Sequence, residues 1–432
     1  MHTYSQIDLD QESIEVRDDA MVVRKSTVGG LRILTEKIPG QRSVALGLWI
    51  GAGSRDEAAG AYGSTHFLEH LLFKGTKTRS AAQIAEETDF LGGDVNAMTA
   101  KQFTCYHGRV FPSDLPQLAQ LLVDMVTSAR LAESDMLLER DVILDELAMY
   151  ATDPSEVAHE ALPATLLGSH PLARPVGGTK ESVADLDHRH LTDHYLTYYH
   201  RGELVVTAAG DIDHDEVVTL ITSLVDRAGW VESEPVTARR TEPPINFHAT
   251  QTRIVMPGEQ TAVIAGIPGL PKLDERRYAL QSAMAILGGG TSSRLFQEIR
   301  DKRGLAYSAY SYATGYTTGG LIGLAAPTSP AKAELVSELI GEVLDDLARG
   351  GVTEVEVDSA FRRVRAALVF DAESVHNRMI RLGVGQLTTG VLTSMAETLR
   401  RSELVGVGEV MDLVRELADR PRSLVIAGPE VD

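Results

Sequence analysis

The chain has 432 residues, more than one ordinary hydrophobic core supports, so two domains of about 200 residues each are expected. Hydrophobic residues make up 43% of the sequence and charged residues 24%, a balance typical of globular proteins. There are 61 acidic and 41 basic residues, which gives a net charge of -20. That charge disfavours nucleic acids and anionic membranes as partners.

The number of cysteines and the composition of the first residues indicate in which cellular compartment the protein is expected. Cys105 is the single cysteine of the sequence, which excludes an intramolecular disulfide and a thiolate metal set, as is common in reducing compartments. The beginning of the chain is polar and acidic, and it lacks the basic start and apolar run of a secretory signal. No later stretch is long and apolar enough to span a membrane. We therefore expect a cytoplasmic protein.

In the first half, residues 1–20 are expected to form a flexible tail, and the elements that follow alternate between strand and helix patterns. Segments 21–25 and 31–37 flank Gly29-Gly30 and predict a hairpin. Further elements are predicted as a strand at 43–50, helices at 63–73 and 80–91, strand material at 95–110, helices at 113–130 and 133–151, a buried strand at 204–210 and a helix from 215.

A change in composition divides the chain. Residues 230–248 are rich in Pro, Glu, Thr and Arg and carry no period, which predicts a linker between domains at 21–229 and 249–432. The second half repeats the style of the first. It is predicted to contain strands at 251–266, a helix at 274–287, strands at 305–326, helices at 331–349 and 353–370, and a last strand at 423–427. The pattern favours an α+β fold with two similar sandwich halves, each a mostly antiparallel sheet covered by helices.

The strongest chemical motif is His66-Phe67-Leu68-Glu69-His70, which lies in an apolar helical pattern. Residues four apart share one face of a helix, so His66 and His70 can direct two imidazoles at one metal ion. Glu69 lies about 60° from His66 and about 100° from His70 around the helix. This keeps its carboxylate beside the metal as a candidate base. The order is the inverse of the commoner H-E-x-x-H motif.

A catalytic zinc site takes three protein ligands and leaves one position open. The predicted helix at 133–151 carries Glu139 and Glu146 two turns apart, on a face expected to be packed together with Ile143 and Tyr150. A carboxylate on a packed face requires a partner, and a metal ion is a suitable one. Glu146 is the predicted ligand, and Glu139 is predicted to orient a ligand histidine or water.

Other interpretations compete with this one. His66 and His70 could be ordinary core or surface histidines. A rival cluster consists of His188, His190 and His194, with His190 and His194 also four apart, but its segment is polar and offers no nearby base. The run 288–290 consists of three glycines, and no G-K-[ST] follows it, which disfavours a phosphate loop.

With HFLEH, the following LLFKGT, and ERDVILDE in place, the chain resembles the pitrilysin/insulinase family of inverted-motif zinc peptidases, in particular the branch of mitochondrial processing peptidase and its bacterial relatives. GGDVNAMTAKQFTCY and LGGGTSSRLFQEIRDKRGLAYS extend the resemblance, which covers nearly everything from residue 27 to the C-terminus. It implies one zinc ion per chain on His66, His70 and Glu146, with Glu69 as general base and Glu139 as a supporting acid. It also implies two halves that form a clamshell around a chamber.

The resemblance further implies substrate-binding residues. Arg300 and Tyr307 match an arginine–tyrosine pair that contacts the substrate carbonyl near the metal, and Tyr307 is expected to open a strand after a turn at Gly304. Without the resemblance, Arg300 would be interpreted as a solvated charge at a helix end and Tyr307 as a strand residue. Asn96 and Ala97 match an edge strand that binds peptide by strand addition; Asn96 could instead be a turn residue.

The expected activity is zinc-dependent endopeptidase cleavage of short peptides or unfolded segments. Glu69 takes the proton of the attacking water and returns it to the leaving amine, while the Tyr307 hydroxyl helps to stabilise the oxyanion. The alternative is a non-catalytic, processing-peptidase-like assembly subunit, although such subunits usually lack part of the metal set. Because this chain carries both the metal motif and the arginine–tyrosine pair, a homodimer is expected.

Overall fold

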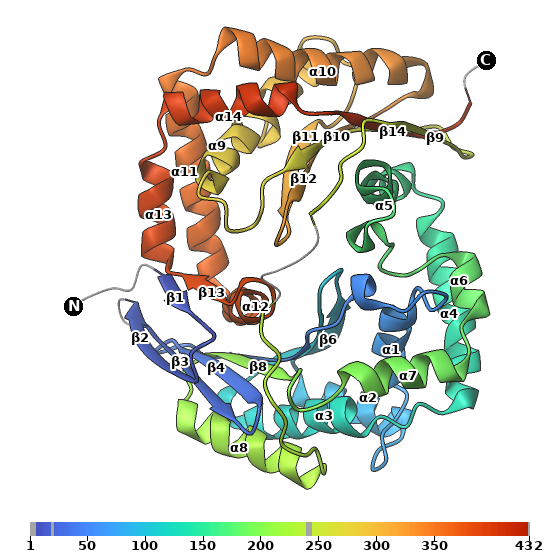
Figure 1. Ribbon diagram of the computed structural model, residues 1–432, viewed down its shortest axis with the longest axis vertical. Helices are drawn as coiled ribbons and strands as arrows, with labels where there is room; N and C mark the ends of the chain where they lie inside the picture. The colour runs from blue at the N-terminus through green and yellow to red at the C-terminus, as the bar shows by residue number, and fades with distance from the viewer. Residues whose placement is uncertain (1–5, 19–20, 239–243, 431–432) are drawn as a thin grey trace. The chain divides into compact units, whose positions relative to one another are not determined.

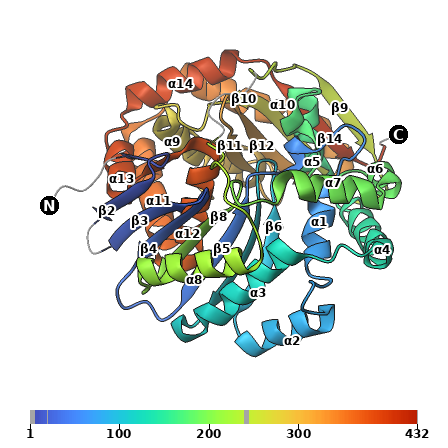
Figure 2. The same ribbon diagram turned by 60° about the horizontal axis from the view of Figure 1, so that its bottom comes forward.

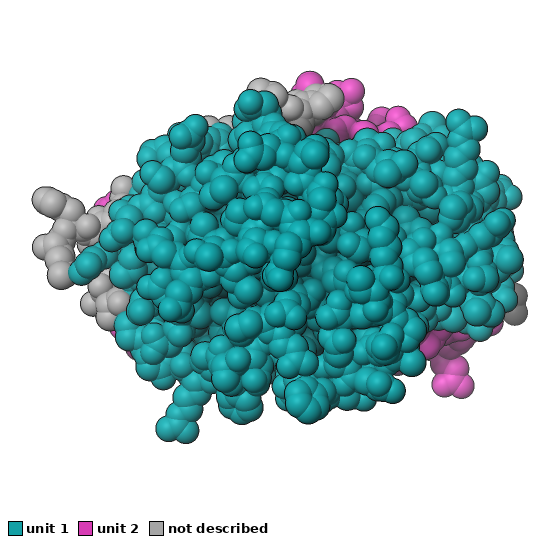
Figure 3. Space-filling view, turned by 90° about the horizontal axis from the view of Figure 1, so that it is seen from below, with its two compact units in different colours: residues 1–147, 174–240, 370–397 teal, residues 148–173, 241–369, 398–432 magenta. Residues whose placement is uncertain are grey.

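A computed structural model describes residues 6–18, 21–238 and 244–430. Its contacts divide the chain into two compact units, each assembled from three stretches and coloured separately in Figure 3. Unit 1 comprises residues 1–147, 174–240 and 370–397, and unit 2 comprises residues 148–173, 241–369 and 398–432. Each unit holds a mixed sheet covered by helices, which confirms the predicted α+β class.

The sheet of unit 1 has seven strands in the order β2-β3-β4-β8-β5-β7-β6. Only the β4–β8 pair is parallel. The predicted hairpin is present as β3 and β4, and its turn uses Gly29 and Gly30 with φ of 55° and 89°, values that favour glycine. The strands are β2 (Ser13–Asp18), β3 (Met21–Val28), β4 (Leu31–Lys37), β5 (Val44–Ile50), β6 (Asp94–Thr99), β7 (Thr104–Val110) and β8 (Val205–Gly210).

Helices cover one face of this sheet with an apolar core. Helices α3 and α8 lie side by side against it (Figure 2) and bury residues such as Leu118, Leu122 and Ile221. Apart from α5, which belongs to unit 2, the described helices of this half of the chain are α1 (Ser64–Leu72), α2 (Ala81–Leu91), α3 (Leu115–Ser128), α4 (Glu133–Tyr150), α6 (Lys180–Asp185), α7 (His188–Tyr198) and α8 (His214–Arg227), with short 3-10 turns η1 (Ser54–Asp56), η2 (Pro112–Asp114) and η3 (Pro171–Ala173).

The other face of the same sheet is covered by α12 (Val375–Val384), which comes from late in the sequence (Figure 1). Met379 of this helix belongs to the same buried cluster as Trp49. Glu36 is fully buried and forms ion pairs with Arg378 and Arg381 of α12. After α12 come a π-helix, η6 (Gly385–Thr389), and β13 (Val391–Thr393).

The expected flexible tail at 1–20 is wrong for its described part. Residues Gln6–Asp8 form β1, which pairs with β13, and Ser13–Asp18 form β2, which pairs with β3. The apolar side chains Ile7, Leu9 and Ile14 are buried and supply the packing that holds this segment to the unit. Residues 1–5 and 19–20 lie outside the described residues.

Unit 2 is built on a five-stranded sheet in the order β11-β12-β10-β14-β9, in which β14 and β9 are parallel and the other pairs antiparallel. Its strands are β9 (Gln251–Val255), β10 (Thr261–Gly269), β11 (Tyr310–Gly315), β12 (Gly320–Thr328) and β14 (Ser423–Gly428). Its helices are α5 (Pro154–Leu167), α9 (Arg277–Gly288), the π-helix η4 (Phe296–Asp301), the 3-10 turn η5 (Pro330–Lys332), α10 (Ala333–Gly350), α11 (Glu354–Glu373), α13 (Met395–Glu403) and α14 (Val407–Asp419).

Contacts group the chain differently from the expected boundaries 21–229 and 249–432. Helix α5 packs on β10 and β14 of unit 2, where Leu162 and Leu166 are buried, and α12 packs on unit 1. Each unit therefore includes a helix from the other half of the sequence. The described parts of the expected linker, 230–238 and 244–248, contain neither helix nor strand.

Sequence patterns did not predict α5, α6, α7 or the elements from α12 to α14. Within the described parts of the chain, none of the helices combines the length and the apolar content that a membrane crossing needs.

Candidate metal centre

Helix α1 carries the HxxEH motif and is fixed at its start by Glu57. The N-cap residue, Gly63, has a φ of 92°, and the Glu57 carboxylate accepts hydrogen bonds from the backbone N–H groups of Gly63 (2.8 Å) and Thr65 (2.9 Å). Burial raises the pKa of Glu57 to about 7. The opposite face of the helix is packed into the core by Phe67, Leu68, Leu71 and Leu72. The motif therefore stands on a rigid element.

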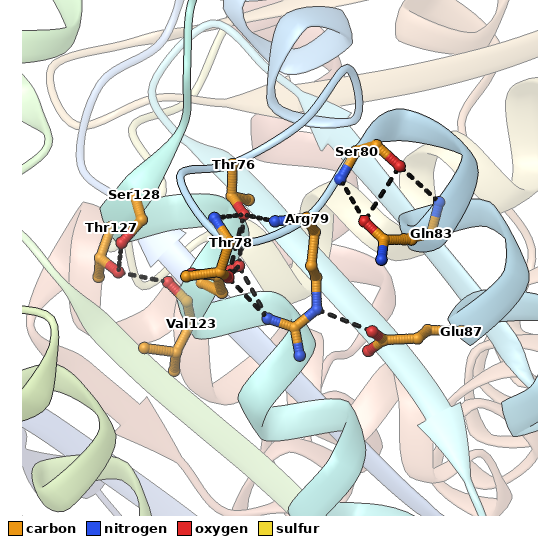
Figure 4. A network of polar contacts seen from close by, with 10 residues as sticks. Thr76, Thr78, Arg79, Ser80, Gln83, Glu87, Val123, Thr127 and Ser128 are labelled. Atoms are coloured by element: carbon orange, nitrogen blue, oxygen red, sulfur yellow. Dashed lines mark hydrogen bonds and ion pairs between the residues drawn. The ribbon is translucent and has the colours of Figure 1, made fainter.

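A polar network fixes the segment that leaves α1 (Figure 4). The Thr76 hydroxyl donates to Asp124 (2.6 Å), and the Arg79 guanidinium donates both to Asp124 (2.8 Å) and to Glu87 (3.0 Å). These bonds join the connection after α1 to α2 and α3. Both ends of the motif helix are thus held by hydrogen bonds from other elements.

The structure brings His66, His70 and Glu146 together. Glu146 Oε2 lies 3.5 Å from His70 Nε2 and 4.0 Å from His66 Nε2, and one donor atom from each residue lies within 4.8 Å of the others. Among the residues that the structure describes, no other such group of three His, Cys, Asp or Glu side chains was found. Zinc bonds of about 2.0–2.2 Å in a tetrahedron separate neighbouring donor atoms by about 3.3–3.6 Å, so this group fits zinc after small side-chain adjustments.

His70 is oriented from behind by Glu139. Its Nδ1 lies 3.2 Å from Glu139 Oε2, where an Nδ1–H donates to the carboxylate and leaves Nε2 free to bind metal. Glu139 is 5% exposed and also forms an ion pair with Lys74. Lys74 was not among the predicted site residues, although it stands four residues after His70, one helical turn away.

His66 is held in the neutral form that a metal ligand requires. Burial, followed by the proximity of His70, lowers the pKa of His66. Its Nδ1 atom is buried and has no hydrogen-bond partner among the described residues. The rings of His66 and His70 meet edge to face with centroids 4.7 Å apart.

Glu69 stands next to the three-residue group without belonging to it. The hydroxyl of Thr99, the last residue of β6, donates a hydrogen bond to Glu69 Oε2. Burial raises the pKa of Glu69, while the bond from Thr99 opposes this shift. The sequence analysis did not predict this contact, although Thr99 lies within the quoted GGDVNAMTAKQFTCY motif.

Strand β6 is the outermost strand of the seven-stranded sheet and contacts α1 (Figure 1). Asn96 and Ala97 lie at its middle, opposite His107 and Tyr106 of β7. Asn96 is thus a strand residue, and the alternative turn interpretation is wrong. Its Oδ1 accepts a hydrogen bond from the Ala97 N–H (2.8 Å).

Arg300 and Tyr307 form a pair in unit 2. The Arg300 guanidinium lies over the Tyr307 ring at 4.8 Å and over the Phe296 ring at 4.6 Å. Gly304 has a φ of 59° and donates its N–H to the Arg300 carbonyl (2.8 Å), so the expected turn is present. The expectation that Tyr307 opens a strand is wrong, because β11 begins at Tyr310 and the Tyr307 side chain is 82% exposed on the connection before it.

The rival histidines have separate structural roles. His188 Nε2 donates to the Leu131 carbonyl (2.6 Å), His190 contacts Asp187 at the start of α7, and His194 contacts the Ser64 and Thr65 hydroxyls. They therefore do not form a common site.

Tyr150 and the glycine run at 288–290 remain to be placed. Tyr150 is not packed with Glu139 but is 47% exposed, because the last buried residue of α4 is Ile143. The glycine run closes α9 and has a packing reason: an added Cβ on Gly288 would approach Ser311 N to 2.2 Å, and one on Gly290 would approach the Arg363 guanidinium to 2.1 Å.

Comparisons with known proteins agree with this geometry. Residues 32–180 match the family model described as insulinase (peptidase family M16), and residues 185–364 match the model described as peptidase M16 inactive domain. A Streptomyces coelicolor protein named an uncharacterized zinc protease is 39% identical over 414 residues, which cover 95% of this chain and 90% of that protein. The chain belongs to the insulinase (peptidase M16) family.

Other relatives of this M16 chain carry the same kind of name. Uncharacterized zinc proteases of Mycobacterium bovis and Bacillus subtilis are 40% and 34% identical, each over 411 residues, with 95% of this chain and 94% and 98% of those proteins covered. A solved structure titled as a peptidase M16 inactive domain from Pseudomonas fluorescens superposes with a TM-score of 0.84 at 23% identity, covering 95% of this chain and 98% of that one. A protease from Helicobacter pylori gives 0.84 at 20% identity, covering 94% and 99%. Both share the fold.

Proposed function

We propose that this M16 chain is a zinc-dependent endopeptidase with one zinc ion held by His66, His70 and Glu146. One observation carries the proposal: two imidazole nitrogens from α1 and a carboxylate oxygen from α4 converge, with a second carboxylate, that of Glu69, beside them. The names of the relatives support the same reading of the site. A structural zinc site would be closed by four protein ligands, whereas this donor set leaves a position for water.

Zinc held by these three residues would supply Lewis acidity that polarises water and the scissile carbonyl. Glu69 accepts the proton of the attacking water and later delivers it to the leaving amine. The Thr99 hydroxyl holds the Glu69 carboxylate in place for this transfer. Glu139 keeps His70 in one orientation and one tautomer through its contact with Nδ1.

For substrate binding we propose strand addition along β6. This strand pairs only with β7 among the described strands, and its end at Thr99 meets Glu69, so an extended peptide paired with Asn96 and Ala97 would run toward the base.

We further propose that Arg300 and the Tyr307 hydroxyl contact the substrate carbonyls when the two halves close as a clamshell around a chamber. The exposure of Tyr307 supports this, since its hydroxyl is accessible to a ligand. Enclosure favours short or unfolded peptides over folded proteins.

The assembly and location are also part of the proposal. We propose a homodimer, because each chain carries both the metal-binding residues and the arginine–tyrosine pair and needs no complementary subunit to supply them. A cytoplasmic location is proposed from the single cysteine, Cys105, which is buried and free. Sedimentation analysis of the purified protein tests the dimer, and a monomer at micromolar concentration would contradict it.

The function is tested by hydrolysis of internally quenched peptides before and after zinc removal by a chelator. We expect hydrolysis to stop on chelation and to return when one equivalent of zinc per chain is added. Glu146→Gln should lose both zinc and activity, while Asp145→Asn, which changes the neighbouring exposed carboxylate, should keep both. Hydrolysis that continues in fully metal-free protein would refute the proposal.

A further inference from the structure

Unit 1 contains a polar cavity that the proposed chemistry does not use. Its volume is about 590 Å³, and it lies over the strands β3 and β4, the segment 232–237 and the π-helix Gly385–Thr389. Lys25 of β3 and Arg32 of β4 line it from the sheet. Ligand sites for small molecules commonly measure about 300–1,000 Å³, so the cavity is large enough for one.

Two buried cations line this cavity without a direct ion pair to a described carboxylate. Carboxylates act on them only through longer-range charge interactions: Asp8, Asp10 and Glu12 on Lys25, and Asp10 and Glu203 on Arg32. Lys25 and Arg32 are each 3% exposed, and neither forms an ion pair with any described residue. Lys25 donates to the carbonyls of Leu9 and Gln11, and Arg32 donates to the carbonyls of residues 202, 203 and 236. Buried charges are normally paired with an opposite charge, because desolvation is costly and carbonyl dipoles offset only part of that cost.

Burial of Lys25 and Arg32 disfavours their charged forms and therefore lowers the pKa of both side chains. Desolvation lowers the pKa of Lys25 to about 8 and that of Arg32 to about 10, and the charge of Arg32 further lowers the pKa of Lys25. An anion placed between them would relieve both effects.

Hydrogen-bonding groups in the cavity are also unsatisfied. Arg32 Nε and Gln386 Oε1 are buried and have no partner among the described residues. An ammonium group carries three donors, and Lys25 uses two of them on carbonyls. The cavity thus offers two cationic donors and one amide acceptor, which suits a ligand with an oxyanion and a separate donor group.

The rim of the cavity has the opposite charge. Four exposed carboxylates line it, those of Asp10, Glu12, Glu232 and Glu234. These carboxylates would repel a ligand that carries only negative charge and would attract a positively charged group. Cations at the base and carboxylates at the rim therefore favour a molecule that carries both charges.

We propose that this cavity binds a small zwitterion, a free amino acid or dipeptide. Its carboxylate binds Lys25 and Arg32, its donor groups reach Gln386 Oε1, and its ammonium group lies against the carboxylates of Glu232 and Glu234. The site is separate from the HxxEH group and does not depend on the peptidase activity. Binding there ties the segment 232–237 to the sheet.

The experiment measures binding to the full chain by calorimetry and by the shift of the melting temperature. The probes are the twenty free amino acids, and for each one that binds, its N-acetyl and its carboxamide derivatives, together with inorganic phosphate. We expect at least one amino acid to bind at millimolar concentration or below. Each derivative should bind about tenfold more weakly or worse, because each lacks one of the two charged contacts. Phosphate should bind more weakly than the amino acid.

Two variants locate the binding. Gln386→Met breaks no hydrogen bond that the described residues form and should weaken the amino acid without lowering the melting temperature of the free protein. Lys25→Met should abolish binding. The controls are Gln120→Met on the exposed face of α3 and Lys37→Met on β4, which should bind like the parent.

Several results would overturn the proposal. One is that none of the twenty amino acids binds. Another is that the N-acetyl derivative or phosphate binds as tightly as the amino acid, which would make this a plain anion site. Unchanged binding in both Gln386→Met and Lys25→Met would place the ligand elsewhere.

Discussion

The candidate metal group in unit 1, formed by His66, His70 and Glu146 with Glu139 behind them, and the Arg300–Tyr307 pair in unit 2 are built in different ways. His66 and His70 stand on the packed helix α1, Glu139 and Glu146 stand on α4, and Glu139 is buried behind His70. Tyr307 stands on an irregular connection and is 82% exposed, with its ring beneath the Arg300 guanidinium. The side chains of the first site are already held in position by neighbouring residues before a ligand binds. In the second site, the Tyr307 side chain is exposed and would be buried only by a ligand or by another element of the protein.

This difference separates the expected effects of mutation. Changes in the prepared group should alter metal affinity or chemistry, since those side chains are already in position. Changes in the exposed pair should alter turnover and leave metal content and stability unchanged, because those side chains support little of the fold. The predictions below probe each side of this contrast.

The largest effect is expected from Glu69→Gln. Removing a general base lowers turnover by about 10²–10⁴-fold, while zinc content should remain at one per chain because Glu69 is not a ligand. Peptide hydrolysis and metal analysis of the same preparation measure both quantities. Glu86→Gln on the exposed side of α2 is the control. If the Glu69→Gln variant hydrolyses peptides at the normal rate, Glu69 is not the general base.

Tyr307→Phe should lower kcat by about 10²-fold, the effect of losing one oxyanion donor, with zinc content and melting temperature unchanged. Tyr150→Phe, at another exposed tyrosine, should have no effect. A parallel loss of zinc and turnover would show that Tyr307 supports the structure. Unchanged turnover would mean that the exposed pair takes no part in the reaction.

Glu139→Gln should weaken zinc binding by about 10–100-fold, because a residue that orients a ligand histidine commonly has that effect. Competition with a chromophoric chelator gives the affinity. Lys74→Met is the matched variant, since it removes the ion pair with Glu139 but leaves the contact with His70. If Lys74→Met lowers the zinc affinity as much as Glu139→Gln does, then Glu139 supports zinc binding through its ion pair with Lys74 and not through its contact with His70.

A last prediction concerns the pH dependence of stability and the packing beneath α1. His194 is 6% exposed, and burial lowers its pKa from 6.5 to about 4. The unfolded chain therefore binds a proton more tightly, so the stability contributed by neutral His194 is complete above pH 6.5 and is lost as the pH falls toward 4. The full shift of 6.5 - 4 = 2.5 units corresponds to about 3 kcal/mol.

His194→Gln removes this titration. Urea unfolding of the metal-free protein between pH 7 and pH 4.5 should show a flatter dependence of unfolding free energy on pH in the variant than in the parent. His190→Gln, at an exposed position on the same helix, should retain the parent slope. Equal slopes in all three proteins would mean that folding does not change the pKa of His194.

The predicted zinc ligands lie together in the structure, and the signal within each helix is local. His66 and His70 are one helical turn apart, and Glu139 and Glu146 share a later helix, so helical periodicity alone places each pair. The β3–β4 hairpin is equally local, since Gly29-Gly30 permits the turn. Such features need no knowledge of which distant segments meet.

Features that depend on distant contacts were missed. Thr99 reaches Glu69 across 30 residues, and α12 covers a sheet whose strands lie more than 150 residues earlier. Neither contact leaves a periodic pattern in the sequence. The same limit explains why Tyr150 was expected to be packed. Helix periodicity predicted which side of α4 Tyr150 is on, but it could not predict how far along α4 the neighbouring elements extend.

Zinc K-edge X-ray absorption on the purified protein, with metal content per chain measured on the same sample, tests the central claim most directly. The account predicts one zinc per chain with two imidazole nitrogens and light oxygen donors at about 2.0–2.2 Å, and Glu146→Gln should lose this spectrum. Zinc bound by more than two imidazoles, or an unchanged spectrum in the Glu146 variant, would contradict it.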